Sequence, residues 1–226
     1  MDNALEKLIT TMFQAHPWHG VPPGDPAGVV EAYIEIVTTD TVKYELDKES
    51  GHLRIDRPQR YSSQPPTPYG FIPQTYCGTR VGQRCSERCG VPNIRGDGDP
   101  MDVCILTEKS MAHANFFLRA RPIGGLRMID GEEADDKIVA VLERDMAYGD
   151  LRDIADCPKG IVERLRHYFL TYKQMPGEKA REVRIAEVYD RVEAVEVIRL
   201  SLQDYRDTFG APEIRGAALA RLLGKT

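Results

Sequence analysis

The segment GDGDPMDV places three carboxylates, Asp97, Asp99 and Asp102, within six residues and directly before an apolar run. Acids this close repel one another and oppose folding unless a cation screens them. Hard divalent cations bind such oxygens, and Mg²⁺ in particular is held by one or a few carboxylates while it keeps waters and phosphate ligands. The segment therefore predicts either a magnesium site or a solvated acidic turn. It does not fit an EF-hand, whose glycine position is taken by Asp102.

A second acidic segment, IDGEEADDK at residues 129–137, places Asp130 and Asp135 in an expected turn between two strands. Taken alone, this pattern indicates a solvated hairpin loop. Together with the first cluster, it offers the additional carboxylates that a site for several metal ions needs.

Cationic and phenolic side chains complete the set of candidate site residues. Lys43 lies on the polar face of one expected strand, Arg57 follows the next strand, Tyr69 ends a proline-rich loop, and Tyr172 with Lys173 ends an expected helix. Each also has an ordinary interpretation as a surface cation or a tyrosine at the edge of a core. If they converge with the acids, the pocket suits metal ions and a phosphate anion, because metals neutralise charge while Lys, Arg and Tyr orient oxygens.

The elements that must position these side chains are mainly strands. Alternation of apolar and polar residues predicts strands within residues 29–56, with a hairpin turn at 48–51. Further strands are expected at 101–106, 116–121, 125–129 and 137–142, without the alternating helices of a βαβ protein. Apolar stripes at helical spacing predict two late helices, one within residues 160–174 and one behind a possible Asp190 cap. The fold class is therefore α+β and mainly β, a small closed or half-open barrel flanked by two or more helices.

The sequence indicates that both ends of the chain are extensions of a central domain. The spacing of apolar residues predicts an amphipathic helix over residues 3–14, and the Pro- and Gly-rich stretch 16–28 is the best linker candidate. His16 and His19 in that stretch are interpreted as loop residues rather than metal ligands. The last residues, EIRGAALARLLGKT, predict a short third helix or a frayed tail.

Composition bounds the class of protein. The chain has 226 residues, a length that allows one large domain or one domain with extensions. Its formal net charge is −5. No apolar stretch approaches the length of a membrane span, and five irregularly spaced cysteines are unlike a secreted disulfide framework, so we expect a cytoplasmic protein with reduced thiols. The acidic balance argues against nucleic acid or an anionic membrane as a partner.

Six blocks of the sequence, in order, closely resemble the family I soluble inorganic pyrophosphatases. The blocks are VEAYIEI, VKYELDKESGHLRIDR, PYGFIPQTY, GDGDPMDV, RPIGGLRMIDGEEADDK and HYFLTYK, and DGDPMD fits the DxDPxD signature of that family. The resemblance covers roughly residues 28–205 and implies a five-stranded OB-like barrel flanked by helices. We accordingly expect an N-terminal extension at 1–27, a catalytic domain at 28–209 with a Cys- and Arg-rich insert at about 77–95, and a tail at 210–226.

The resemblance also implies ligands for the metal. Asp97, Asp102 and Asp135 would bind one Mg²⁺, and Asp102 would be shared with a second ion. Asp130 and Glu35 would help to hold the ions that arrive with the substrate.

The same resemblance implies the chemistry. Asp99 would be the general base for a water that bridges two Mg²⁺ ions and attacks one phosphorus of pyrophosphate in line. Contacts to pyrophosphate or to the leaving phosphate would come from Lys43, Arg57, Tyr69, Tyr172 and Lys173, with Lys137 and Glu45 in support. Family members are commonly oligomers, so a homo-oligomer is expected.

Two residues depart from the family pattern, and two other functions stay open. Pro65 stands where the family usually has a tyrosine, and Gly131 stands where it usually has a glutamate. The altered Pro65 region is the motive for one alternative, a phosphohydrolase of a larger diphosphate. A non-catalytic OB-like protein that binds nucleic acid or protein is the other, which the acid clusters oppose.

The insert CGTRVGQRCSERCGVPNIR is particular to this sequence. Its three cysteines, Cys77, Cys85 and Cys89, allow a structural zinc site, a redox-sensitive pair or unligated reduced thiols, and the spacing favours the last. Its four arginines could steer an anion or simply solubilise a loop.

Overall fold

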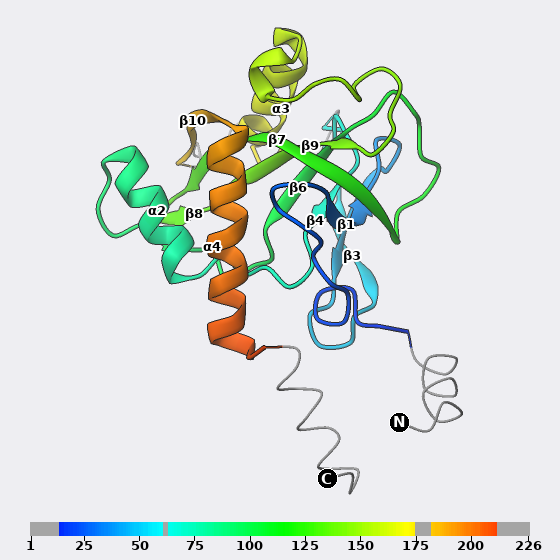
Figure 1. Cartoon of the computed structure of the whole chain (residues 1–226). Helices are drawn as coiled ribbons and strands as arrows, with labels where there is room; N and C mark the ends of the chain where they lie inside the picture. Colours follow the sequence, from blue (N-terminus) through cyan, green and yellow to red (C-terminus); the bar gives the residue numbers. More distant parts are fainter. Residues whose placement is uncertain (1–13, 61–62, 175–181, 212–226) are drawn as a thin grey trace, which may run out of the picture.

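A closed ring of five strands forms the centre of the molecule (Figure 1). The computed structural model describes residues 14–60, 63–174 and 182–211, so most of the predicted N-terminal helix and nearly all of the predicted tail lie outside the described residues. The ring runs in the order β1 (Val30–Ile36), β4 (Tyr69–Phe71), β6 (Asp102–Leu106), β9 (Lys137–Leu142) and β7 (Phe116–Asp130). Because β7 also pairs with β1, the ring closes, and the predicted OB-like barrel is confirmed.

Strand β7 is long enough to pair with four other strands. The sequence predicts strands at 116–121 and 125–129, but the structure has one continuous strand of 15 residues with a register shift between Pro122 and Gly124. A bulge at this point is expected, because proline cannot donate a ladder hydrogen bond. The first half of β7 pairs with β1, and the second half pairs with β8 (Glu133–Ala134) and β10 (Val183–Asp190).

A separate hairpin carries several candidate site residues. Strand β2 (Val42–Leu46) pairs with β3 (Leu53–Pro58), as the alternation of residues 42–56 predicts. The turn contains Gly51 at φ +72°, a left-handed conformation that favours glycine, and the Asp47 carboxylate accepts a hydrogen bond of 2.8 Å from the Ser50 N–H.

Three helices flank the barrel among the described residues: α2 (Thr79–Cys89), α3 (Lys159–Thr171) and α4 (Arg191–Phe209). Both late helices are confirmed, and Asp190 caps α4 by accepting a hydrogen bond of 2.9 Å from the Glu193 N–H. Helix α4 packs across β7 with α2 beside it, and α3 contacts β10 (Figure 1). A single turn of 3₁₀ helix (Ile154–Asp156) precedes α3 in the chain.

Helix α2 and strand β10 were not predicted from the sequence. Helix α2 occupies the Cys- and Arg-rich insert and is followed by β5 (Arg95–Gly96). Its buried side is formed by Val81, Gly82 and Cys85, with Cys89 packed at the edge of the core. Two of these positions are cysteines, so the apolar stripe is visible only if cysteine is counted as an apolar residue.

The segment predicted as a linker packs firmly against the barrel. Trp18 is 3% exposed, and its indole N–H donates a hydrogen bond of 2.8 Å to the Thr75 carbonyl oxygen. Its ring lies 5.1 Å from that of Phe209 on α4. His16 accepts from the backbone N–H groups of Trp18 and His19, which fits its interpretation as a loop residue.

None of the helices in the described ranges is long and apolar enough to cross a membrane.

Candidate active site

One cavity of about 400 Å³ contains every candidate site residue named from the sequence. Strands of the barrel, the β2–β3 hairpin, the acidic loop before β6 and the end of α3 all contribute to its wall. The eleven predicted residues that line it are Glu35, Lys43, Arg57, Tyr69, Asp97, Asp99, Asp102, Asp130, Asp135, Tyr172 and Lys173.

Strand register brings the two acidic segments together. Strands β6 and β9 are parallel neighbours, and Asp102 lies opposite Lys137 at their first residues. Asp130 ends β7, and the tight turn into β8 returns the chain so that the Asp135 N–H donates a hydrogen bond of 2.9 Å to the Met128 carbonyl oxygen. Acids that are 28 to 38 residues apart in the chain therefore reach the same end of the barrel.

The acidic loop is held by the first residue of the insert. The Cys77 N–H donates to the Asp99 carbonyl oxygen at 2.8 Å, and the Cys77 carbonyl oxygen accepts from the Gly98 N–H at 3.0 Å. Within the loop, the Asp99 N–H donates to the Asp97 carboxylate at 2.9 Å. These bonds leave the Asp99 side chain 45% exposed and facing the cavity.

Burial and like charge shift three acids of the cavity, Glu35, Asp97 and Asp102, toward their neutral form. Burial, together with the charges of Asp135 and Asp102, raises the pKa of Asp97 to about 8. Burial also raises the pKa of Glu35 to about 8, although its carboxylate accepts a short hydrogen bond of 2.6 Å from the Leu46 N–H. Both carboxyl groups would release their protons more readily if a cation lay beside them.

A buried lysine supplies part of the positive charge that these acids need. Lys137 is 2% exposed, and its ammonium group contacts the carboxylates of both Asp102 and Asp135. Burial alone would lower the pKa of Lys137, but the charges of Asp102 and Asp135 outweigh it and hold the pKa well above its ordinary value. With this ammonium between them, the acids do not form a ready-made cluster of three metal ligands in the part of the chain described.

Further cations lie around the cavity. Lys173 binds the Asp130 carboxylate at 2.8 Å, and Lys43 lies 3.2 Å from Asp56 on the neighbouring strand. Burial acts to lower the pKa of Lys43, but the charges of Glu45 and Asp56 raise it overall. The phenol of Tyr69 has a pKa raised well above its ordinary value, first by burial and then by the charge of Asp102.

Four polar residues that line the cavity were not singled out from the sequence as site residues: Lys48, Arg60, Glu133 and Tyr168. The ammonium group of Lys48 contacts the Asp99 carboxylate. Lys48 belongs to the hairpin turn, where a lysine is ordinary, so only the fold shows its position. Glu133 lies inside the second acidic segment, whose density of acids was the available signal.

The two departures from the family pattern occupy different places. Pro65 is buried in the wall of a separate surface hollow, beside Pro66 and Thr67, and does not line the cavity. Gly131 has φ +65° in the turn between β7 and β8, where a residue with a side chain would be strained.

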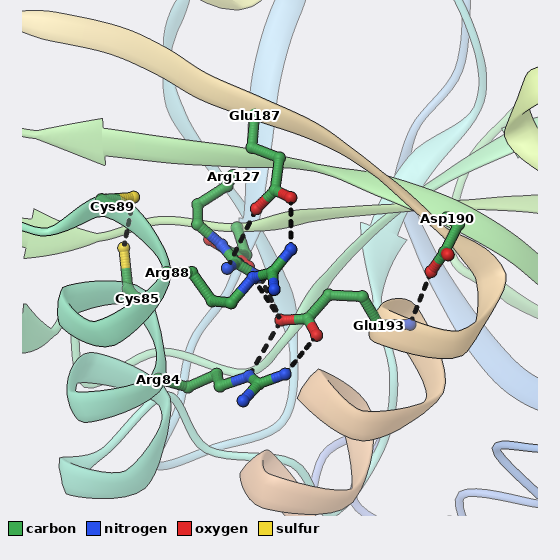
Figure 2. Close-up of polar contacts among 9 residues, drawn as sticks. Arg84, Cys85, Arg88, Cys89, Arg127, Glu187, Asp190 and Glu193 are labelled. Atoms are coloured by element: carbon green, nitrogen blue, oxygen red, sulfur yellow. Dashed lines mark hydrogen bonds and ion pairs between the residues drawn. The ribbon is translucent and has the colours of Figure 1, made fainter.

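The cysteines of the insert are free thiols, as are the other two in the described residues. Cys85 and Cys89 lie one helical turn apart on α2, with their sulfur atoms 4.0 Å from each other (Figure 2). Cys77 is buried in the core, where burial and nearby aspartates raise the pKa of its thiol well above the ordinary value.

A closed barrel with an acid-rich cavity ringed by lysine, arginine and tyrosine is typical of enzymes that bring hard cations and phosphate groups together. The family model described as inorganic pyrophosphatase matches residues 32–206, and the chain belongs to this family.

Individual relatives agree with this assignment. An inorganic pyrophosphatase of Chlamydia trachomatis serovar D is 48% identical over 205 residues, which span 88% of this chain and 98% of the relative. A soluble inorganic pyrophosphatase of Oryza sativa subsp. japonica is 37% identical over 206 residues, spanning 88% and 86%. The crystal structure of inorganic pyrophosphatase from Thermus thermophilus superposes with a TM-score of 0.70 at 28% identity, covering 85% of this chain and 99% of that one.

Proposed function

We propose that this protein hydrolyses inorganic pyrophosphate to two phosphates with the help of Mg²⁺. The observation that carries the proposal is the single cavity in which the acids and the cations predicted for this reaction lie together. Membership of the inorganic pyrophosphatase family supports the reaction.

The donor chemistry of the cavity fits hard divalent cations. Eight acidic side chains line it against six lysines and arginines, and two of the buried carboxyl groups have their pKa raised to about 8. We propose that Asp97, Asp102 and Asp135 hold one Mg²⁺ with Asp102 shared by a second ion. Asp130 and Glu35 help to hold further ions. When bound, Mg²⁺ supplies a water of lowered pKa and neutralises charge on the phosphate oxygens.

The remaining residues act on the water and on the substrate. Asp99 is the proposed general base, because its carboxylate faces the cavity and belongs to a loop that backbone hydrogen bonds hold in place. The groups proposed to contact the phosphate oxygens and keep the substrate aligned for in-line attack are Lys43, Arg57, Tyr69, Tyr172 and Lys173.

Two further parts of the proposal concern the location of the protein and its oligomeric state. Five free cysteines favour a reducing compartment, and we propose a cytoplasmic location. We also propose that the protein forms a homo-oligomer, as the resemblance to its family implies.

The test of the proposed function is a comparison of substrates. Phosphate release is measured from pyrophosphate and from an organic diphosphate ester, each with Mg²⁺ and with EDTA. We expect rapid Mg²⁺-dependent release from pyrophosphate and little from the ester. Faster turnover of the ester would instead support a phosphohydrolase of a larger diphosphate, and no turnover of either by the folded protein would support a binding protein.

A further inference from the structure

Behind the wall of the cavity lies a group of three arginines and three carboxylates that the proposed reaction does not use. Its members come from α2, β7, β10, α4 and the residue directly before β9, and we call them the arginine cluster (Figure 2). The residues of the arginine cluster are Arg84, Arg88, Arg127, Asp136, Glu187 and Glu193.

Arg127 is the buried centre of this cluster. Its side chain is 0% exposed, and its Nη2 lies 2.5 Å from Glu193 and its Nη1 3.2 Å from Glu187. Its Nε lies 3.8 Å from the Asp136 carboxylate, and its guanidinium carbon lies 4.9 Å from the centre of the Tyr189 ring. A charge buried this completely persists only when partners compensate it, so the position of Arg127 is tightly fixed by its surroundings.

Helix α2 closes the outer side of the cluster. Arg84 donates two hydrogen bonds to Glu193, at 3.0 Å and 2.5 Å, and Arg88 donates one of 2.7 Å to Glu187. Three arginines therefore lie against three acidic side chains, and the two carboxylates closest to Arg127 also bind arginines of the insert. Figure 2 shows Arg84 and Arg88 reaching from α2 toward Glu193 on α4 and Glu187 on β10.

Asp136 connects the cluster to the cavity. It stands between Asp135 and Lys137 in the chain, and adjacent residues of an extended backbone point to opposite sides. Asp135 and Lys137 line the cavity, whereas Asp136 is 3% exposed and lies beside Arg127. A shift of Asp136 would thus move both neighbours on the other side of the backbone.

We propose that Arg127 is a positioning residue for the metal site: through its ion pair with Asp136, on the side away from the cavity, it helps to fix Asp135 and Lys137 in the cavity. Through Arg84 and Glu193, helix α2 contributes to the same effect. The proposal rests on the proposed function in one respect, the assignment of Asp135 as a metal ligand. Residues behind the ligands of a metal commonly change its affinity by about 10- to 100-fold.

The test is Mg²⁺ binding to the protein without substrate, measured by titration calorimetry. For Arg127→Met we expect the dissociation constant of Mg²⁺ to rise about 10-fold. For Arg127→Lys, which keeps the positive charge, we expect a smaller rise. The sign separates positioning from simple electrostatics, because removal of a positive charge near the site would by itself tighten Mg²⁺ binding. Circular dichroism establishes that each variant is folded.

Arg80→Gln is the matched control. Arg80 also lies on α2 and also binds α4, at 3.1 Å from Asp204, but it does not belong to the arginine cluster. Its substitution should leave Mg²⁺ affinity unchanged.

Unchanged or tighter binding by folded Arg127→Met would overturn the proposal. If Arg127→Met does not fold, Arg84→Gln replaces it, with an expected weakening of about 3-fold; affinity equal to that of Arg80→Gln would then overturn it. Failure of the proposed function gives a different result, in which pyrophosphate is not hydrolysed although Mg²⁺ affinity still falls in Arg127→Met.

Discussion

Glu35 is a buried acid that should make the metal-free protein less stable as the pH rises. Its carboxyl group is ionised above pH 4.5 in the unfolded chain, whereas burial raises its pKa to about 8 in the folded protein. Between these values the folded state holds a proton that the unfolded state has released, so the free energy of unfolding falls with rising pH. The stability that the protonated Glu35 side chain contributes is fully present below pH 4.5 and is lost as the pH rises through about 8.

The size of the effect follows from the same two pKa values. A difference from 4.5 to about 8 corresponds to ~5 kcal/mol of unfolding free energy at alkaline pH. Glu35→Gln removes the charge but buries an amide that needs its own partners, at a cost of ~1–3 kcal/mol. We therefore expect the variant to be ~2–4 kcal/mol more stable than the wild type at pH 8.5 in EDTA, and not more stable at pH 5.

Urea denaturation at several pH values measures this difference. Glu31→Gln is the control, because Glu31 lies on the same strand but its side chain is 30% exposed beside Arg119. The control should follow the pH dependence of the wild type. Parallel stability curves for Glu35→Gln and the wild type from pH 5 to 8.5 would refute the reasoning.

Two further predictions concern other buried groups. Lys137→Met removes the cation that contacts Asp102 and Asp135, so urea denaturation in EDTA should show a loss of ~3–5 kcal/mol. Saturating Mg²⁺ should recover much of it, and an equal loss with and without Mg²⁺ would contradict the proposed metal site. Trp18→Ala removes a ring that is 3% exposed and packs on Phe209, so the unfolding free energy should fall by ~3–5 kcal/mol. Trp18 does not line the cavity, so phosphate release by the folded variant should stay near the wild-type rate; a large fall would show that this packing also shapes the site.

Local patterns in the sequence predict most of the barrel and the two late helices. Alternating apolar and polar residues predict β1, β2 and β3, although six of the seven residues of β1 are buried, including Tyr33 and Glu35 at the polar positions. Helix α4 is equally plain, because an apolar stripe follows the Asp190 cap.

The missed elements lack such a pattern. Strand β10 has four half-buried and three exposed residues, with Tyr189 as its one buried residue, and it is defined by pairing with the second half of β7. Helix α2 presents few apolar residues, and its arginines are explained only by carboxylates on β10 and α4. Tertiary partners, rather than local propensity, determine both.

The residues of the candidate site could be named from the sequence, but their arrangement in one cavity could not be predicted from it. Crowded acids such as Asp97 and Asp102 indicate either a cation site or a solvated acidic turn, and the roles of the individual residues come from the family resemblance. Spacing does not show that Asp135 from one segment and Tyr69 from another share a cavity, because barrel closure brings them together. The contact between Lys48 and Asp99 depends on the position of a turn and left no signal in the sequence.

The measurement that tests the account most directly is phosphate release from pyrophosphate by the wild type and by Asp99→Asn across a range of Mg²⁺ concentrations. Asp207→Asn is the control, because Asp207 is 62% exposed, binds Arg80 and lies outside the cavity. We predict Mg²⁺-dependent turnover that Asp99→Asn reduces by ~10²- to 10⁴-fold and that Asp207→Asn leaves unchanged. Equal turnover by wild type and Asp99→Asn, or no turnover by the folded wild type with Mg²⁺, would contradict the assignment of this cavity and its base.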